Sequence, residues 1–100
     1  MTSEIDGGVF LKDLAVGTTL RVQTQSRAYV IDKVAENDYL LSGHPKYCPE
    51  PTKAYIHGST FGGSLIKVGF VGQDMRLEFH TDEHPGRITT TRVVDIKEMQ

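Results

Sequence analysis

Hydrophobic and polar residues alternate along most of this chain. One polar residue separates Leu20 from Val22. Single polar residues likewise separate Met75, Leu77 and Phe79. A period of two is typical of strands that bury one face. The pattern predicts seven extended segments, the last of which counts as one or two strands: 20–24, 28–34, 39–42, 53–59, 65–71, 75–80 and 88–96.

The segments between these runs have the composition of turns. Residues 25–27 are polar and join the first two runs into a predicted hairpin, and the sequence Glu-Asn-Asp at 36–38 is typical of a tight turn. Residues 43–51 contain three prolines, which lack a backbone donor and exclude a central strand. We therefore expect a stiff surface loop at 43–51 and a second turn, marked by Pro85 and Gly86, before the final run.

These elements predict an all-β fold, a small single-domain antiparallel β-barrel of six to seven strands. So many short strands in 100 residues bury more apolar surface when the sheet closes than when it stays flat. The domain is expected to span residues 1–100. Residues 1–16 form a lead-in, either extended or with one helical turn, from which Phe10 and Leu14 are expected to plug one end of the barrel.

Composition narrows the classes of partner. The formal net charge of −2 gives no electrostatic reason to expect nucleic acid or an anionic membrane. No apolar run approaches the ~20 residues that span a bilayer, and the polar N-terminus does not resemble a signal peptide. The single cysteine excludes an internal disulfide. A cytoplasmic location is the expectation.

The run His57-Gly-Ser-Thr-Phe-Gly-Gly-Ser64 concentrates three glycines and three hydroxyl residues. Such a run suits a phosphate cradle or a corner between two strands. It lacks the lysine and the strand-to-helix context of a P-loop. The sequence therefore favours a corner at Gly58, Gly62 and Gly63, with Gly69 and Gly72 as further bends.

Histidines and the cysteine offer a few further candidates for chemistry. His44 and Cys48 are four residues apart, as are His80 and His84, but that spacing has no fixed geometry in loops or strands. There is no CxxC or HExxH motif. We expect no metal, no cofactor and no catalytic residue. A small hydrolase or metal-binding protein built on His44, Cys48 and His57 remains an alternative.

Three segments resemble small uncharacterised bacterial proteins of about this length, a resemblance that covers most of the chain. They are Gly-Thr-Thr-Leu-Arg-Val-Gln-Thr at 17–24, Gly-Ser-Thr-Phe-Gly-Gly-Ser at 58–64 and Ile-Thr-Thr-Thr-Arg-Val at 88–93. This resemblance implies a β-barrel and brings no function with it.

A fainter resemblance is to PilZ domains, which are small β-barrels that bind cyclic di-GMP. Residues 57–62 keep the serine and glycine of the PilZ motif Asp/Asn-x-Ser-x-x-Gly, with histidine in place of the acid or amide. Residues 72–79 resemble the glycine turn into an alternating strand. In place of the family's Arg-x-x-x-Arg, this chain has Arg21 and Arg27, six residues apart. The resemblance implies a degenerate PilZ-like barrel that acts through protein interaction.

Together these patterns predict a non-catalytic accessory or interaction module. Its expected partner is another protein, or a second copy of the chain bound through an exposed strand edge. The alternative is a PilZ-like domain for a cyclic dinucleotide or another small ligand. The residues at stake in that alternative are Arg21, Arg27, His57, Ser59, Gly62 and Gly63.

Overall fold

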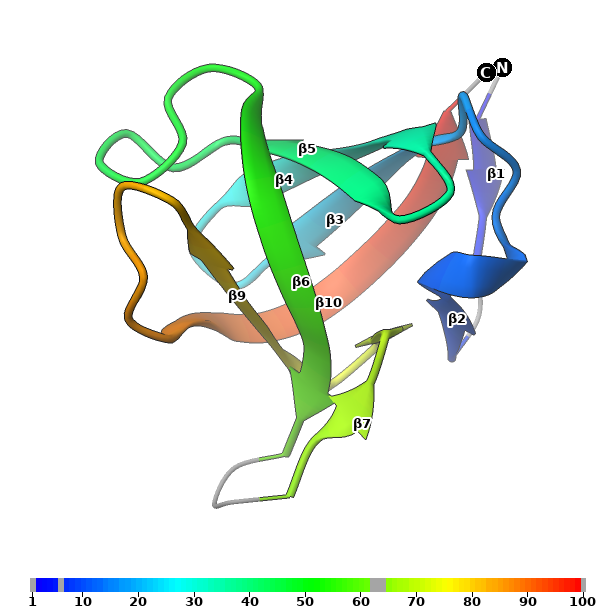
Figure 1. Ribbon diagram of the computed structural model, residues 1–100. Helices are drawn as coiled ribbons and strands as arrows, with labels where there is room; N and C mark the ends of the chain where they lie inside the picture. The colour runs from blue at the N-terminus through cyan, green and yellow to red at the C-terminus, as the bar shows by residue number, and fades with distance from the viewer. Residues whose placement is uncertain (1, 6, 62–64, 100) are drawn as a thin grey trace.

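Strands account for most of the structure, a computed structural model that describes residues 2–5, 7–61 and 65–99 (Figure 1). One short 3-10 helix, η1 (Leu11–Asp13), lies among the described residues near the N-terminus. The strands are β1 (Thr2–Glu4), β2 (Gly8–Phe10), β3 (Thr19–Thr24), β4 (Ala28–Ala35), β5 (Asp38–Ser42), β6 (Thr52–Thr60), β7 (Lys67–Val68), β8 (Phe70–Gly72), β9 (Arg76–Thr81) and β10 (Ile88–Met99).

The main sheet closes on itself. An antiparallel path runs from β10 through β3, β4 and β5 to β6, and β9 then pairs with β6 on one side and with β10 on the other. Figure 1 shows the resulting ring, with the long strands β6 and β10 curving around it. The predicted all-β antiparallel barrel is confirmed.

The alternation in the sequence is what fills the barrel. In the β3–β4 pair, Leu20 lies opposite Ile31 and Val22 lies opposite Tyr29, and all four side chains are buried. The intervening Arg21 is exposed. Because side chains on a strand point alternately to the two faces, this register places one apolar set inside and one polar set outside.

The predicted strand 65–71 is wrong as a single element. Gly69 adopts a positive φ of 68°, a left-handed conformation that favours glycine, and it separates β7 from β8. β7 stays on β6, whereas β8 leaves the main sheet and pairs with β2. The bend expected at Gly69 therefore divides the segment between two sheets.

The N-terminal segment combines the two expected conformations, an extended strand followed by a helical turn. Leu11 in η1 is buried against the core, and Leu14 packs beside it as predicted. Phe10 instead packs on Phe70, with ring centroids 4.8 Å apart. Leu11, rather than Phe10, is therefore the buried side chain at this end of the barrel.

A lysine holds this segment against the barrel. Lys33 in β4 is only 1% exposed, and its ε-amino group donates to the carbonyl oxygens of Leu11 at 3.0 Å and Leu14 at 2.7 Å. A buried polar group needs such partners, because leaving it without them costs several kcal/mol. The Lys33 side chain thus ties η1 and the residue that follows it to the interior of β4.

The proline-rich segment 43–51 contains no strand, as predicted, but it does not lie wholly at the surface. Cys48 is fully buried within the core cluster. An isolated bridge joins its backbone to His44, with the Cys48 N–H donating to the His44 carbonyl at 3.0 Å. The loop therefore folds back on itself and inserts one side chain into the barrel.

Replacing Lys33 with methionine should lower the free energy of unfolding by about 1–3 kcal/mol, because the Leu14 carbonyl then loses its buried donor. Urea unfolding followed by circular dichroism measures the change. Lys53→Met is the matched control, since Lys53 is exposed and should change stability by less than about 0.5 kcal/mol. Equal stability of Lys33→Met and the wild type would contradict the role given to Lys33.

Candidate functional site

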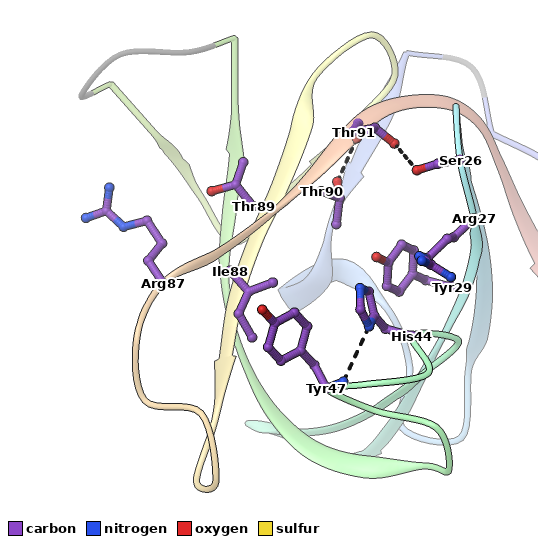
Figure 2. A pocket seen from close by; sticks show the side chains of 10 residues that line it. All are labelled: Ser26, Arg27, Tyr29, His44, Tyr47, Arg87, Ile88, Thr89, Thr90 and Thr91. Atoms are coloured by element: carbon purple, nitrogen blue, oxygen red, sulfur yellow. Dashed lines mark hydrogen bonds between the residues drawn. The ribbon is translucent and has the colours of Figure 1, made fainter.

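A polar pocket opens at the end of the barrel opposite η1. It has a volume of about 290 Å³ and lies where the β3–β4 turn, the loop 43–51 and the start of β10 meet (Figure 2). β3 pairs with β10 on one side and with β4 on the other, and β4 pairs with β5, so these pairings place the three segments side by side. The lining residues are Ser26, Arg27, Tyr29, His44, Tyr47, Arg87, Ile88, Thr89, Thr90 and Thr91.

The β3–β4 turn fixes the backbone of Arg27. The Thr24 hydroxyl donates to the Arg27 carbonyl at 2.9 Å and accepts the Arg27 N–H at 3.0 Å. Next to it, the hydroxyls of Ser26 and Thr91 lie 2.8 Å apart and link the turn to β10. Threonine and serine favour such local bonds in turns. Hydrogen bonds therefore hold the backbone from which the Arg27 side chain extends.

The loop 43–51 fixes the orientation of His44. Gly43 has a φ of 119°, and a Cβ there would overlap the Ala28 carbonyl, so only glycine fits. The Nδ1 of His44 accepts the backbone N–H groups of Lys46 at 3.1 Å and Tyr47 at 3.3 Å. Since Nδ1 is the acceptor, Nε2 carries the proton in the neutral ring. The opposite nitrogen of His44 in Figure 2 is thus a hydrogen-bond donor.

Aromatic rings form the floor and one wall of the pocket. Tyr29 packs edge-on against Phe79 with centroids 6.3 Å apart, and His44 lies between Tyr29 and Tyr47, at 6.5 Å and 4.6 Å (Figure 2). Tyr47 also contacts the ring of His84 at 4.9 Å. The rings hold one another in place, which makes this end of the barrel rigid.

Cations and neutral donors dominate the electrostatics of the pocket. None of its described lining residues is Asp or Glu, and no carboxylate among the described residues pairs with Arg27. Burial, helped by the positive charges of Arg27 and Lys46, lowers the pKa of His44. Burial raises the pKa of Tyr29, so its hydroxyl keeps its proton at neutral pH. The pocket therefore offers hydrogen-bond donors and one unpaired guanidinium.

Arg87 belongs to the pocket lining, but its guanidinium is directed away from the pocket. In Figure 2 its side chain points away from the three aromatic rings. Its Nε lies 3.6 Å from a carboxylate oxygen of Glu78 on the outer face of the barrel. Arg27 is therefore the cation that faces the rings.

The structure separates the described residues among the six that the sequence singles out for ligand binding. Arg27 lines the pocket, whereas Arg21 lies on the outer face of β3 in a shallow depression of about 120 Å³ with Gln23, Asp95 and Lys97. His57 pairs with His80 on the outer face of β6 and β9. Gly62 and Gly63 lie outside the described residues. Arg21 and Arg27 therefore line two different depressions.

Ser59 has a structural environment. It is fully buried, its hydroxyl donates to the Phe70 carbonyl at 2.6 Å, and it accepts the Gly72 N–H at 3.1 Å. Its neighbour Gly58 has a φ of 143°, and a Cβ there would overlap the Lys67 carbonyl. The described part of the glycine-rich run therefore forms a close strand-to-strand corner.

The residues behind the hydrolase and metal alternatives, His44, Cys48 and His57, do not form one cluster. His44 and Cys48 lie in the loop 43–51, whereas His57 lies on β6 and contacts His80. Burial raises the pKa of the Cys48 thiol, which disfavours the nucleophilic thiolate. The described residues also contain no group of three or more His, Cys, Asp or Glu side chains placed to hold a metal ion.

Sequence reasoning missed most of the pocket. The sequence patterns single out neither Tyr29 nor Tyr47 for binding, and they include the threonines at 89–91 only within a resemblance. One available signal was the run of hydroxyl residues at the start of a strand, opposite a turn that carries Arg27. That the two meet across the mouth of the barrel depends on the pairing of β3 with β10.

Comparisons with known proteins add no evidence about the family or the function of this chain. No protein-family model and no curated protein matches the sequence, and no solved structure matches the fold. The resemblance to PilZ domains and to the small bacterial proteins therefore stays a prediction. Within the described part of the chain, no helix has the length and apolar character needed to cross a bilayer.

The buried thiol gives a direct test of the geometry of the loop 43–51. Cys48 is 0% exposed and its pKa is raised by burial, so we expect an aromatic disulfide reagent to modify the native protein far more slowly than the urea-unfolded chain. Absorbance of the released thiolate at pH 8 follows both reactions. Equal rates in the native and unfolded protein would contradict the burial of Cys48.

Proposed function

We propose that this protein is a non-catalytic binding module whose pocket takes a small anionic ligand, a carboxylate or a phosphate monoester. The observation that supports this proposal is the Arg27 guanidinium, which sits at the pocket with no carboxylate partner among the described residues. A guanidinium favours bidentate contacts with carboxylate or phosphate oxygens, so an anion is the natural complement of this cation.

The neighbouring donors support an anion rather than a cation. The Nε2–H of His44 and the hydroxyls of Tyr29 and Tyr47 belong to the same lining as Arg27. His44 is neutral near pH 7, because burial and Arg27 lower its pKa, and it therefore donates without adding a charge. A ligand oxygen placed among these groups would find donors of a fixed orientation, which lowers the entropic cost of binding.

Size and shape limit the ligand to a compact molecule. The pocket volume of about 290 Å³ is close to the lower end of the range for small-molecule sites. The exposed parts of the rings of His44 and Tyr47 give an apolar surface on which a planar group of the ligand can pack. We therefore expect an anionic headgroup near Arg27 and a planar or apolar body against the rings.

A cyclic dinucleotide is less well supported as the ligand. Of the described residues assigned to it from the sequence, only Arg27 lies in this pocket, and the Ser59 hydroxyl bonds to backbone groups in the interior. A smaller anion requires none of the other residues. Cyclic di-GMP belongs in the test as a comparison ligand.

Thermal-shift measurements with inorganic phosphate, nucleoside monophosphates, aromatic carboxylates and cyclic di-GMP test this proposal. A ligand that binds the native state should raise the melting temperature in proportion to its occupancy. For a ligand that does so, calorimetry should show binding weakened about 10- to 100-fold by Arg27→Gln, because a hydrogen bond to a charged group contributes ~1.5–3 kcal/mol.

Arg76→Gln is the matched control, since Arg76 is also exposed but lies outside the pocket lining. It should leave the affinity unchanged. Salt should weaken binding of the wild type more than binding of Arg27→Gln, because screening acts on the ion pair. The proposal fails if no anion in the panel shifts the melting temperature, or if both arginine variants bind as the wild type does.

A second candidate function, self-association, is favoured by a different surface. The arm formed by the end of β6 and β7 projects from the barrel (Figure 1), and its apolar side chains are exposed: Phe61 by 79%, Leu65 by 83%, Ile66 by 36% and Val68 by 75%. β7 is the last strand on its sheet path, so among the described strands its second edge has no partner. An apolar edge strand is suited to pairing with the same strand of a second copy.

Sedimentation equilibrium tests self-association directly. We expect a concentration-dependent dimer, which Leu65→Glu combined with Val68→Glu should dissociate because both charges would be buried in the contact. Val34→Glu, on β4 and also exposed, should leave the dimer intact. A wild-type protein that stays monomeric at high micromolar concentration would rule out this candidate without affecting anion binding.

A further inference from the structure

A pair of histidines meets on the outer face of the barrel, outside the anion pocket. The Nε2 of His57 on β6 and the Nδ1 of His80 on β9 lie 2.5 Å apart, with ring planes at 69°. Tyr55 stacks on the other side of His80, with centroids 4.7 Å apart and planes at 15°. The His80 ring is thus held between two neighbours, and one of its nitrogens points at His57.

An irregularity in strand pairing brings the two rings together. Tyr55 lies opposite His80 and Gly58 lies opposite Glu78, but the register shifts between Ile56 and Gly58, so that His57 is the extra residue of a bulge. A bulge re-aims the side chain it carries. Here it leaves His57 between the two outward-facing residues of β9, beside a glycine that takes no room.

The contact between the two rings brings together two nitrogens that can both ligate a metal ion. In a hydrogen bond between two neutral imidazoles, one proton lies between two nitrogens, and both nitrogens point at the same small volume. Metals bind the neutral form of imidazole, and both rings here present a nitrogen to the same volume. When the ring that donates the shared proton shifts to the tautomer protonated on its other nitrogen, both rings stay neutral and a metal ion between them meets two nitrogen donors at once.

The charged groups around the pair balance one another. Glu78 is 5% exposed, and its carboxylate lies 3.5 Å from the Thr89 hydroxyl and 3.6 Å from the Nε of Arg87. Its negative charge acts on His57 in opposition to the positive charge of Arg87. The Arg87 side chain is 61% exposed, whereas the side chain of Glu78 is only 7% exposed.

We propose that His57 and His80 together bind a divalent transition-metal ion of the class that prefers imidazole, Zn²⁺, Ni²⁺ or Cu²⁺. Bonds of ~2.0–2.1 Å at a tetrahedral angle separate two nitrogen ligands by roughly 3.3 Å, so the rings must move apart by under an ångström from their hydrogen-bonded contact. Both side chains are only half-buried, which leaves room for that movement. Two protein nitrogens leave the remaining coordination positions to water or to an external ligand.

Zinc and nickel titrations of the full chain test this proposal. Calorimetry should give one site per chain, and His57→Ala and His80→Ala should each weaken binding at least tenfold. His84→Ala is the control and should bind as the wild type does, since His84 contacts Tyr47 and not the pair. Glu78→Gln should weaken binding severalfold and Arg87→Ala should strengthen it, because these changes alter the local charge in opposite directions.

Long-range ¹H–¹⁵N spectra of the wild-type histidines give a readout that does not depend on how the variants fold. On addition of Zn²⁺, the Nε2 of His57 and the Nδ1 of His80 should shift together, while the rings of His44 and His84 should not. The proposal is overturned if no metal binds at millimolar concentration, if the shifts fall on His44 or His84, or if both alanine variants of the pair retain wild-type affinity. Anion binding at Arg27 is measured without metal, so the two proposals fail independently.

Discussion

The structure depends on the closure of its sheet by β9. This strand pairs with β6 along one edge and with β10 along the other, and its inward side chains Leu77 and Phe79 are fully buried between them. Without β9, both β6 and β10 would present open edges and the inner face of each strand would be exposed to water. Closure removes these edges and gives a chain of only 100 residues an interior in which alternating apolar side chains pack from every direction.

Closure also creates two ends, and the polar groups at these ends differ in how they are satisfied. At one end the ε-amino group of Lys33 donates to two backbone carbonyls and anchors the N-terminal segment. At the other end the Arg27 guanidinium has no carboxylate partner among the described residues, although Thr24 fixes its backbone. A satisfied buried donor contributes to stability, whereas an orientated donor without a partner is available to a ligand. This difference separates the structural end of the barrel from the candidate binding end.

The outer face carries the pair His57 and His80, and Glu78 links its surroundings to the lining of the anion pocket. Glu78 contacts Arg87 and Thr89, which belong to the lining of the anion pocket, and its charge also acts on His57. The irregular pairing around Gly58 places His57 at this position, and the same glycine allows β7 to approach β6 closely. The described part of the glycine-rich run therefore sets the geometry of its neighbours, including His57. Its buried serine bonds to backbone and takes no direct part in either candidate site.

The sequence by itself determined the fold class and most strand positions, because a period of two is a local property of the chain. It placed β3, β4, β5, β6 and β9 within a few residues of where they lie, and it missed the division at Gly69, where one backbone conformation sends β8 to another sheet. It identified Arg27 but joined it to Arg21, whose side chain lies on a different face. In β4, every second residue is buried: Tyr29, Ile31 and Lys33. Lys33 follows this alternation although lysine side chains usually stay in water. Only the tertiary structure decided which turns share one end of the barrel and which histidines touch, because strand pairing and a bulge join residues that no local pattern in the sequence connects.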